Sequence, residues 1–335
     1  DNLKKCLVYA LTSNIPELIP FLGMVFFGFP LPLSNILMLC INLGTDIFPS
    51  FSLAWEDGEL DLMLRPPRAK TDHLFTARLI TTAYFQMGAL QSLGAFLCYF
   101  FIMDDFGFPL WSLFKLQYQN GLWPATSSDP YDFYSYDLGN SNVGSLCETG
   151  GAGIANSKLY QQIDWLYLKN ARQDLRNLFI ECDPDTPGAV RPTVTWGDCY
   201  VQQLSSHTNQ PICYSTEALK YAQTGVFFGI VMCQFCNVFA VKTKKLSIYY
   251  QGLKNTMVFA GIASELALTI ILSCCIFIQV GIGSRDVIFY HYGLAAIPFS
   301  IMQMILEETR KYAIRNGKPG KKGKPNWFYR NSYFQ

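Results

Sequence analysis

The sequence has few charged residues for its length, and no run of basic residues alternates with aromatic ones. Lys and Arg number 26 and Asp and Glu 25 among 335 residues, so that charged residues make up 15% of the chain. A nearly neutral chain without such a basic and aromatic run is not typical of a nucleic-acid-binding protein. So low a content of charge is also unusual for a soluble domain. The composition therefore favours a membrane protein.

Six apolar stretches are long enough to cross a bilayer, which takes about 20 residues of helix. They lie near residues 6–28, 32–54, 79–103, 221–241, 256–280 and 287–306. Lys and Arg gather in the segments before the first stretch, after the second, after the fourth and after the sixth. Since such residues mark the cytoplasmic side, we predict an all-α membrane protein with six transmembrane helices and both ends in the cytoplasm.

These stretches divide the chain into four parts. Residues 1–103 carry the first three helices, 104–217 form an extracytoplasmic loop domain, 218–309 carry the last three helices, and 310–335 form a basic cytoplasmic tail. Outside the cytoplasm, the four cysteines of the loop domain can form two disulfides, and the alternative is four free thiols. These residues are Cys147, Cys182, Cys199 and Cys213.

The start of the chain shows neither an initiator methionine nor a signal peptide. The first apolar stretch begins almost at once after DNLKK. We therefore expect this chain to be part of a longer polypeptide.

Oxygen-bearing side chains interrupt the first apolar stretch around a proline. The sequence LTSNIPELIPF places Ser13, Asn14 and Glu17 beside Pro16. Proline removes a backbone donor and frees a carbonyl in the preceding turn. Carbonyls, amide oxygens and carboxylates are the hard ligands that Na⁺, K⁺ and Ca²⁺ prefer. Asn14 and Glu17 are three residues apart, which places them on one face of a helix.

The second stretch repeats this arrangement. Asn42 and Asp46 are four residues apart, with Gly44 between them and Pro49 after them. We expect these residues, like Pro16, to break the helix locally where it lines a cavity. Because a buried acid is costly in a bilayer, Glu17 and Asp46 indicate cation binding. Ser13 and Thr45, taken alone, favour hydrogen bonding between helices.

Three weaker candidates for cation binding lie in later stretches. Gln234 and Asn237 are three residues apart in the fourth stretch, and Glu265 lies in the fifth. Hydrogen bonding between helices is the simpler interpretation of Gln234 and Asn237. Glu265 fits hydrogen bonding and cation binding equally well.

Other polar and small residues of the stretches have structural interpretations. Gln91 is expected to form hydrogen bonds between helices, and Gly88 and Gly94 to allow close helix packing. Glu307 and Glu308, at the end of the sixth stretch, are interpreted as ordinary boundary charges.

Several motifs resemble a known family. DNLKKCLVYALTSNIPELIPFL and LCINLGTDIFPSFSLAWE are similar to the fifth and sixth transmembrane helices of P-type cation-transporting ATPases, above all the Na⁺/K⁺- and H⁺/K⁺-ATPase α-subunit group. RPPRAKTDHLFTARLI, KTKKLSIYYQGLKN and EETRKYAIR resemble later parts of the same proteins. The resemblance implies the C-terminal membrane half, helices five to ten. It does not extend to residues 104–217, where the family has a shorter loop.

The resemblance implies a set of cation ligands. In that family, the counterparts of several of these residues line cation sites that open alternately to the two sides. The implied ligands of Na⁺ and/or K⁺ are Ser13, Asn14, Glu17, Asn42, Thr45, Asp46, Gln234, Asn237 and Glu265. Asn42 and Asn237 stand where Na⁺/K⁺ pumps carry acids, and Ser264 replaces a glutamate. These changes remove carboxylates from the implied sites. Because cations repel one another in a low-dielectric site unless acids compensate their charge, we predict that this protein moves fewer or different ions per cycle than the animal Na⁺/K⁺ pump.

Two functions from different classes follow. The chain is either the C-terminal membrane domain of a pump that moves monovalent cations by alternating access, or a non-transporting structural membrane component derived from a pump half. Retention of Glu17 and Asp46 favours the pump. The family's DKTG motif, nucleotide domain and first four helices have no counterpart here, so that ATP and Mg²⁺ would act only through a missing N-terminal half. We further expect the protein to contact the lipid bilayer, to bind a β-type subunit at 104–217 and to be located in the plasma membrane.

Overall fold

The computed structural model describes residues 2–59, 73–106, 108, 110–114, 180–181, 193–194 and 216–317. The chain forms two compact units. The first comprises Asp1–Leu22, Leu33–Cys98 and Gln223–Gln335, and the second comprises Gly23–Pro32 and Tyr99–Ala222. The four cysteines for which we predicted disulfides lie outside the described residues: Cys147, Cys182, Cys199 and Cys213. Their disulfides therefore stay a prediction. The boundaries of the four predicted parts of the chain also stay a prediction.

Six helices are long and apolar enough to cross a membrane, which confirms the predicted number of spans. The first is α1 (Asn2–Phe27). The second joins α2 (Asn35–Cys40), the π-helical turn η1 (Ile41–Thr45) and α3 (Ile47–Ala54). The third joins α4 (Ala77–Thr81), the π-helical turn η3 (Thr82–Gly88) and α5 (Ala89–Asp105). The last three are α11 (Thr216–Lys242), α13 (Thr256–Cys274) and α15 (Phe289–Asn316).

Shorter elements complete the described structure. They are the helices α6 (Leu110–Leu113), α12 (Ile248–Gln251) and α14 (Ile276–Ile282) and the strands β1 (Ile180–Glu181) and β2 (Thr193–Val194). The two strands pair antiparallel, with Ile180 opposite Val194. The protein is therefore mostly helical, and this small ribbon is an addition to the predicted all-α fold.

Helix ends coincide with residues that satisfy free backbone groups. The hydroxyls of Ser34 and Thr76 accept hydrogen bonds from Leu37 N–H and Leu79 N–H at the starts of α2 and α4, both at 3.3 Å. Such N-caps replace the partners that the first helical N–H groups lack. Gly28 ends α1 with a φ of +70°, a conformation that costs glycine little.

The helix-breaking residues act differently in the first two spans. In the second span, Asp46 N–H donates to Ile41 O at 3.0 Å, a π-type bond that makes a bulge of η1 rather than an unwound segment. In the first span, α1 remains helical through Pro16 and Pro20. We expected Pro16 to break this helix, but it removes only one backbone donor, and the remaining helical bonds hold the turn.

The fifth span is shorter than its apolar stretch. We predicted a span over residues 256–280, but α13 ends at Cys274, and Cys275 adopts an extended conformation before α14 begins. Gln279 on α14 donates its side-chain amide to Ser273 O, and Ser284 donates its hydroxyl to Leu272 O at 2.7 Å. These side chains bind carbonyls that the end of α13 leaves without helical partners, which stabilises the break.

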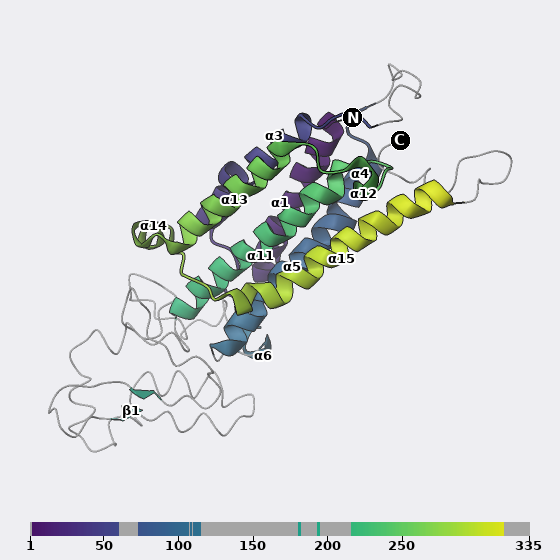
Figure 1. Ribbon diagram of the computed structural model, residues 1–335. Coiled ribbons are helices and arrows are strands. Elements are labelled where there is room, and N and C mark those ends of the chain that lie inside the picture. Colours follow the sequence, from purple (N-terminus) through teal and green to yellow (C-terminus); the bar gives the residue numbers. More distant parts are fainter. Residues whose placement is uncertain are drawn as a thin grey trace. The chain divides into compact units, whose positions relative to one another are not determined.

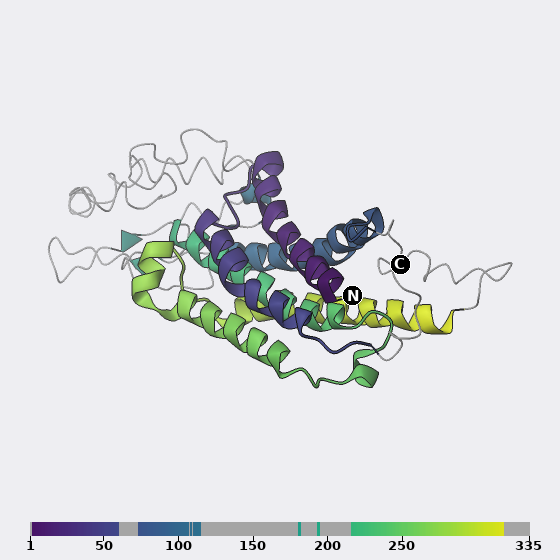
Figure 2. The same ribbon diagram turned by 90° about the horizontal axis from the view of Figure 1, so that it is seen from above.

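Helix α11 runs between α13 and α15 in the first unit (Figure 1), and 78% of its most apolar window is buried, against 33% for α13 and for α15. Small residues allow this packing. A Cβ added to Gly229 on α11 would lie 2.9 Å from Cys98 Sγ on α5, and one added to Gly94 would lie 3.1 Å from Phe299 Cβ on α15. Gly94 therefore permits the close packing that we predicted for it. Figure 2 shows the same helices from above.

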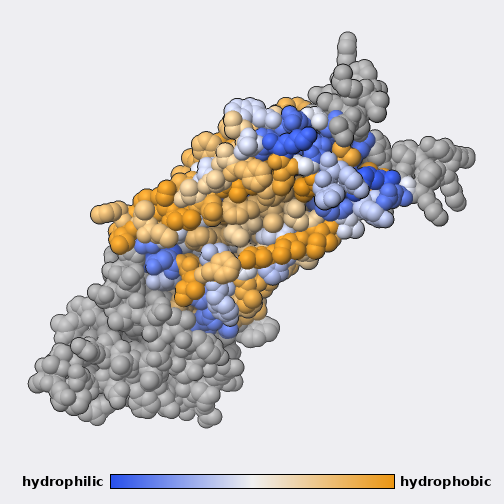
Figure 3. Space-filling model, viewed as in Figure 1, coloured by the Kyte–Doolittle hydropathy of each residue, from blue (hydrophilic) through white to orange (hydrophobic). Residues whose placement is uncertain are grey.

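Hydrophobic side chains cover the visible face of α13, α11 and α15, whereas hydrophilic ones gather at the end that carries α12 (Figure 3). Large exposed hydrophobic residues of α13 and α15 include Ile270, Ile271, Ile301 and Ile305. An apolar band of this kind is what a helix bundle presents to lipid. The protein is thus a multi-pass membrane protein, as predicted.

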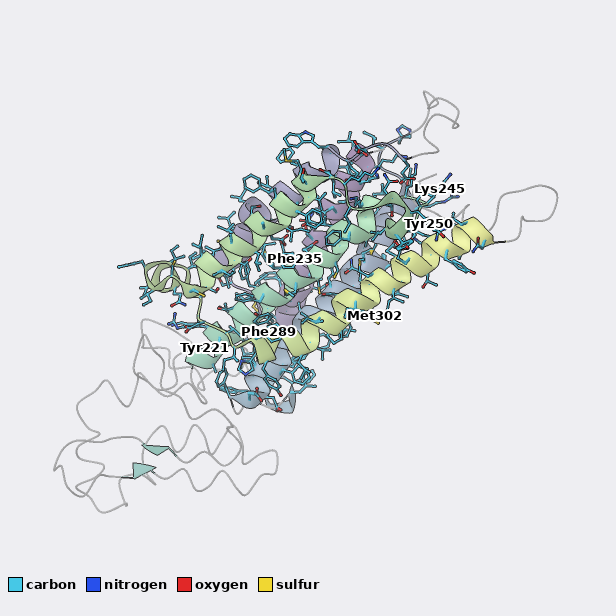
Figure 4. All side chains as sticks on the ribbon, in the orientation of Figure 1. Tyr221, Phe235, Lys245, Tyr250, Phe289 and Met302 are labelled. Atoms are coloured by element: carbon cyan, nitrogen blue, oxygen red, sulfur yellow. The ribbon has the colours of Figure 1, made fainter. Side chains whose placement is uncertain are left out.

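Charged side chains of α15 form contacts at the hydrophilic end. Figure 4 places Lys245 there, and Lys245 O accepts from the Arg315 guanidinium at 2.7 Å. Glu307, which we interpreted as a boundary charge, has no exposed surface and pairs with Arg310 at 2.7 Å. The interpretation is wrong for Glu307 because α15 continues to Asn316 and keeps this residue inside the bundle.

Candidate functional site

An acid and an amide meet where the first and second spans face each other. Glu17 on α1 is 4% exposed, and its Oε2 accepts a hydrogen bond from Asn42 Nδ2 in η1 at 2.6 Å. The same amide nitrogen donates to Met38 O at 3.3 Å. The other carboxylate oxygen, Glu17 Oε1, is buried and has no hydrogen-bond partner in the described part of the chain. Half of this carboxylate is therefore available to a ligand.

Asp46 lies directly after the π-helical turn, and, as in Glu17, only one of its two carboxylate oxygens accepts a hydrogen bond. The Tyr9 hydroxyl of α1 donates to Asp46 Oδ1 at 3.5 Å. Asp46 Oδ2 is buried without a hydrogen-bond partner among the residues that the structure describes. The bulge is what directs the residue inward, because a π-helical turn inserts one extra residue and rotates the side chains that follow it.

A third acid comes from the fifth span. Glu265 has no exposed surface, and neither of its carboxylate oxygens has a hydrogen-bond partner within the described segments. Its helix α13 packs along η1 and α3, and Glu265 interacts electrostatically with Asp46. Gly261 and Gly44 permit this approach, since a Cβ on Gly261 would lie 3.1 Å from Pro49 Cα and one on Gly44 would strike Leu268.

Four buried carboxylate oxygens are thus left without partners around α1, η1 and α13: Glu17 Oε1, Asp46 Oδ2, Glu265 Oε1 and Glu265 Oε2. None of the ion pairs between described residues involves these acids. Burying such oxygens is costly unless a proton or a cation reaches them. Within the described ranges, no three His, Cys, Asp or Glu side chains form a compact metal centre. The arrangement therefore suits a hard cation bound by few acids together with neutral oxygens.

Of the neutral residues of the predicted site on α1 and η1, Ser13 and Thr45 are buried, whereas Asn14 is exposed. The Ser13 hydroxyl donates to Ala10 O at 3.0 Å and also interacts with Asp46. The Thr45 hydroxyl donates to Ile41 O at 3.0 Å. A hydroxyl that donates one hydrogen bond can still accept from or coordinate another group. Asn14 is exposed on α1, so that this chain alone does not bring it to the acids.

Gln234 and Asn237 belong to a separate, closed ring of four amides. Gln91 donates to Gln303 at 3.3 Å, Gln303 to Asn237 at 3.0 Å, Asn237 to Gln234 at 2.9 Å, and Gln234 to Gln91 at 3.3 Å. The ring joins α5, α11 and α15, and each amide in it donates once and accepts once. The hydrogen bonding between helices that we predicted for Gln91, Gln234 and Asn237 is confirmed.

Two members of these clusters were missed at the level of sequence. Tyr9 precedes Ser13 and Glu17 by four and eight residues, a spacing that places all three on one face of α1. This spacing is a signal that was available. Gln303 gave no comparable signal, because its partners lie on helices distant in the sequence.

Comparison with known proteins agrees with the motifs. The family described as "Cation transporting ATPase, C-terminus" matches residues 30–313. The sodium/potassium-transporting ATPase subunit alpha of Hydra vulgaris is 31% identical over 335 residues, covering 100% of this chain and 25% of the relative. The alpha-4 subunit of Homo sapiens and the alpha-B subunit of Artemia franciscana are both 30% identical, with the same coverage. The chain thus spans a quarter of the length of the curated relatives that it matches.

Proposed function

Because this chain belongs to the cation-transporting ATPases, as the C-terminal membrane region of an α-subunit homologous to those of the Na⁺/K⁺-ATPases, we propose that its six spans carry the cation site of an ATP-driven pump. The cargo is a monovalent cation, Na⁺ or K⁺, and transport proceeds by alternating access. One observation carries the proposal: three acids from α1, η1–α3 and α13 are buried with four unpartnered oxygens. Intramembrane acids in this state are functional by default.

The preference for monovalent cations rests on the balance of charged and neutral oxygens. Glu17 is bonded to an amide at Asn42 rather than to a second acid. Ser13 and Thr45 supply hydroxyl oxygens on neighbouring turns. A site with dispersed acids and many neutral oxygens suits an ion of single charge, whereas Ca²⁺ sites gather several carboxylates.

The ligand set that we propose centres on the three acids. Asn42 and Ser13 are the neutral members that contact the acids, and Thr45 directly precedes Asp46 in the chain. Gln234 and Asn237 contribute only where the amide ring opens during the cycle, since both side chains are bonded within it. The full proposed set is Ser13, Asn14, Glu17, Asn42, Thr45, Asp46, Gln234, Asn237 and Glu265.

The exposed position of Asn14 supports a site completed by other helices. Leu18, 49% exposed, and Leu22, 37% exposed, lie on the same face of α1 as Asn14. The match covers only 25% of the relative from Hydra vulgaris, and we propose that an N-terminal half covers this face. That half would also supply the ATP- and Mg²⁺-dependent phosphorylation that drives the cycle.

The surroundings of the pump form part of the same proposal. The apolar band of Figure 3 contacts lipid, and the plasma membrane is the compartment that the family suggests. Residues 104–217 form an extracytoplasmic domain, in which Cys147, Cys182, Cys199 and Cys213 make two disulfides. A β-type subunit binds at this domain.

The proposal is tested in the full-length protein, expressed with its other subunits in cells. Glu17→Gln, Asp46→Asn and Glu265→Gln each remove one acid with little change of shape. Asp286→Asn is the matched control, because Asp286 is exposed and outside the site. We expect each site variant to lose most of the Na⁺- and K⁺-dependent ATPase activity while the control keeps it. Unchanged activity in all three site variants would favour the structural alternative instead.

A further inference from the structure

The connection between the fifth and sixth spans carries apolar side chains on its outside and polar ones on its inside. It comprises residues 275–288 and contains the short helix α14. On this helix, Ile276 is 66% exposed, Phe277 94% and Val280 69%, whereas Gln279 is only 2% exposed. A connection that lies in water normally has the reverse distribution, because polar side chains are the ones that water solvates.

Polar groups of this connection bind to the protein instead of facing outward. Gln279 donates to Asp286 Oδ1 at 3.4 Å as well as to the end of α13. Ser284 and Arg285 are 1% and 4% exposed. The Arg285 guanidinium donates to Ser284 O at 2.8 Å, and its backbone N–H donates to the Thr224 hydroxyl of α11 at 2.9 Å. A bilayer tolerates backbone outside regular helices only where its polar groups find partners in the protein, and these bonds serve that need.

The apolar surface of α14 continues that of the two spans which it joins. Figure 1 places α14 at the end of α13 that lies away from α12. Ile270, on the last turns of α13, is 47% exposed. At the start of α15, Phe289 and Tyr290 are 61% and 58% exposed. Large apolar side chains are therefore exposed before, within and after the connection, so that the surface attributed to lipid extends over it.

We propose that α14 is an interfacial membrane helix, which inserts its apolar side chains at the boundary between the headgroups and the acyl chains and anchors the end of α13 there. Helices of this type bury their apolar face about 5–10 Å into that boundary. Residues 275–288 carry one cation, Arg285, and one anion, Asp286. With these charges balanced, the partner is the apolar part of a neutral phospholipid. The inference needs only the membrane location of the chain and is independent of the cation site.

The experiment places the full-length protein, with its other subunits, in phosphatidylcholine nanodiscs that are open to water on both sides. A phosphatidylcholine with a photoreactive diazirine near the start of one acyl chain labels residues that contact lipid, and peptide mass spectrometry locates the adducts. Ile270 on the lipid-facing surface is the positive reference. Leu53, with no exposed surface, is the negative reference.

We expect adducts on Ile276, Phe277 and Val280 about as frequent as those on Ile270. Adduct levels closer to that of Leu53 would overturn the proposal. In that case, a membrane-impermeant sulfonated maleimide identifies the true surroundings through the exposed thiols of α13 and its cap, Cys274 and Cys275. Rapid reaction would place the connection in water, and absence of reaction would show that protein covers it.

A pair of variants tests whether the apolar side chains cause the anchoring. Phe277→Asp opposes insertion at a position where 94% exposure leaves few protein contacts to lose, and Phe277→Leu is the matched control. We expect Phe277→Asp to lower the adducts on Ile276 and Val280 about threefold to tenfold, and Phe277→Leu to keep them. Adducts on Ile270 stay unchanged in both. Equal labelling of Ile276 and Val280 in the two variants would contradict an anchor that depends on apolar insertion.

Discussion

The side-chain amide of Asn42 donates a hydrogen bond to Glu17 Oε2 across 2.6 Å and so joins the second span to the first. This contact satisfies one oxygen of a buried acid and leaves the other, Oε1, without a partner in the described structure. A neutral amide at this place keeps the charge of the site low. The identity of residue 42 is therefore expected to set how many cations the site holds.

Replacing this amide by an acid tests that expectation. In Asn42→Asp, a carboxylate faces Glu17 where a donor stood, and two acids at this distance share a proton or require a further cation. We expect the number of cations moved per ATP, or the selectivity between Na⁺ and K⁺, to change. Ion flux and ATP hydrolysis measured together in the full-length protein give this number. An unchanged stoichiometry with unchanged selectivity would refute the expectation.

The hydroxyl of Tyr9 makes a smaller contribution, according to its distance from Asp46. The donor and acceptor are 3.5 Å apart, and a long hydrogen bond of this kind contributes about 0.5–1 kcal/mol. Tyr9→Phe is expected to weaken apparent cation affinity about twofold to fivefold, as measured by K⁺ activation of ATPase activity. Tyr249→Phe serves as the control, since Tyr249 is 89% exposed. Complete loss of activity in Tyr9→Phe would instead make Tyr9 an essential ligand.

The amide ring is expected to stabilise the bundle rather than bind cations in the conformation described. Gln303→Leu leaves Gln91 Nε2 and Asn237 Oδ1 without their ring partners, at a cost of about 1–3 kcal/mol. The thermal unfolding temperature of the purified full-length protein is expected to fall. Gln251→Leu, on the short helix α12 outside the ring, is the control. Equal unfolding temperatures for Gln303→Leu and the unmodified protein would show that the ring adds no stability.

Close approach of α13 to α3 gives a fourth prediction. In Gly261→Ala, the new Cβ would lie 3.1 Å from Pro49 Cα, and backbone cannot yield as a flexible side chain can. We expect a destabilisation of about 1–3 kcal/mol in thermal unfolding. Gly281→Ala has open space around its Cβ and is expected to be neutral or to stabilise by about 0.5–1 kcal/mol. If both variants unfold alike, the helices are less closely packed than described.

Much of this structure follows from local sequence features. The six spans are predictable because hydropathy is a property of each segment by itself, and Glu17 and Asp46 stand out because an acid in a bilayer is costly wherever it lies. The π-helical form of η1 was not predictable, since Gly44 and Pro49 permit several local distortions. Which distortion occurs depends on the packing of α13 against that turn.

Contacts between segments that are distant in the chain could not be predicted from the sequence. The ring partners Gln91 and Gln303 come from the third and sixth spans, and their meeting depends on the rotation and height of both helices. Glu307 was misinterpreted for the same reason, because its burial depends on α15 continuing past the expected end of the span. Tyr9 is the exception, since its spacing from Glu17 places both on one face of α1.

The central claim is that Glu17, Asp46 and Glu265 hold a monovalent cation inside the bundle. The most direct test counts the rubidium or sodium ions that each full-length protein occludes at equilibrium, in the unmodified form and in Asp46→Asn. We predict occlusion of a whole number of ions by the unmodified protein and loss of at least one ion in the variant. The same number of occluded ions in both, or none in the unmodified protein at saturating cation, would contradict the claim.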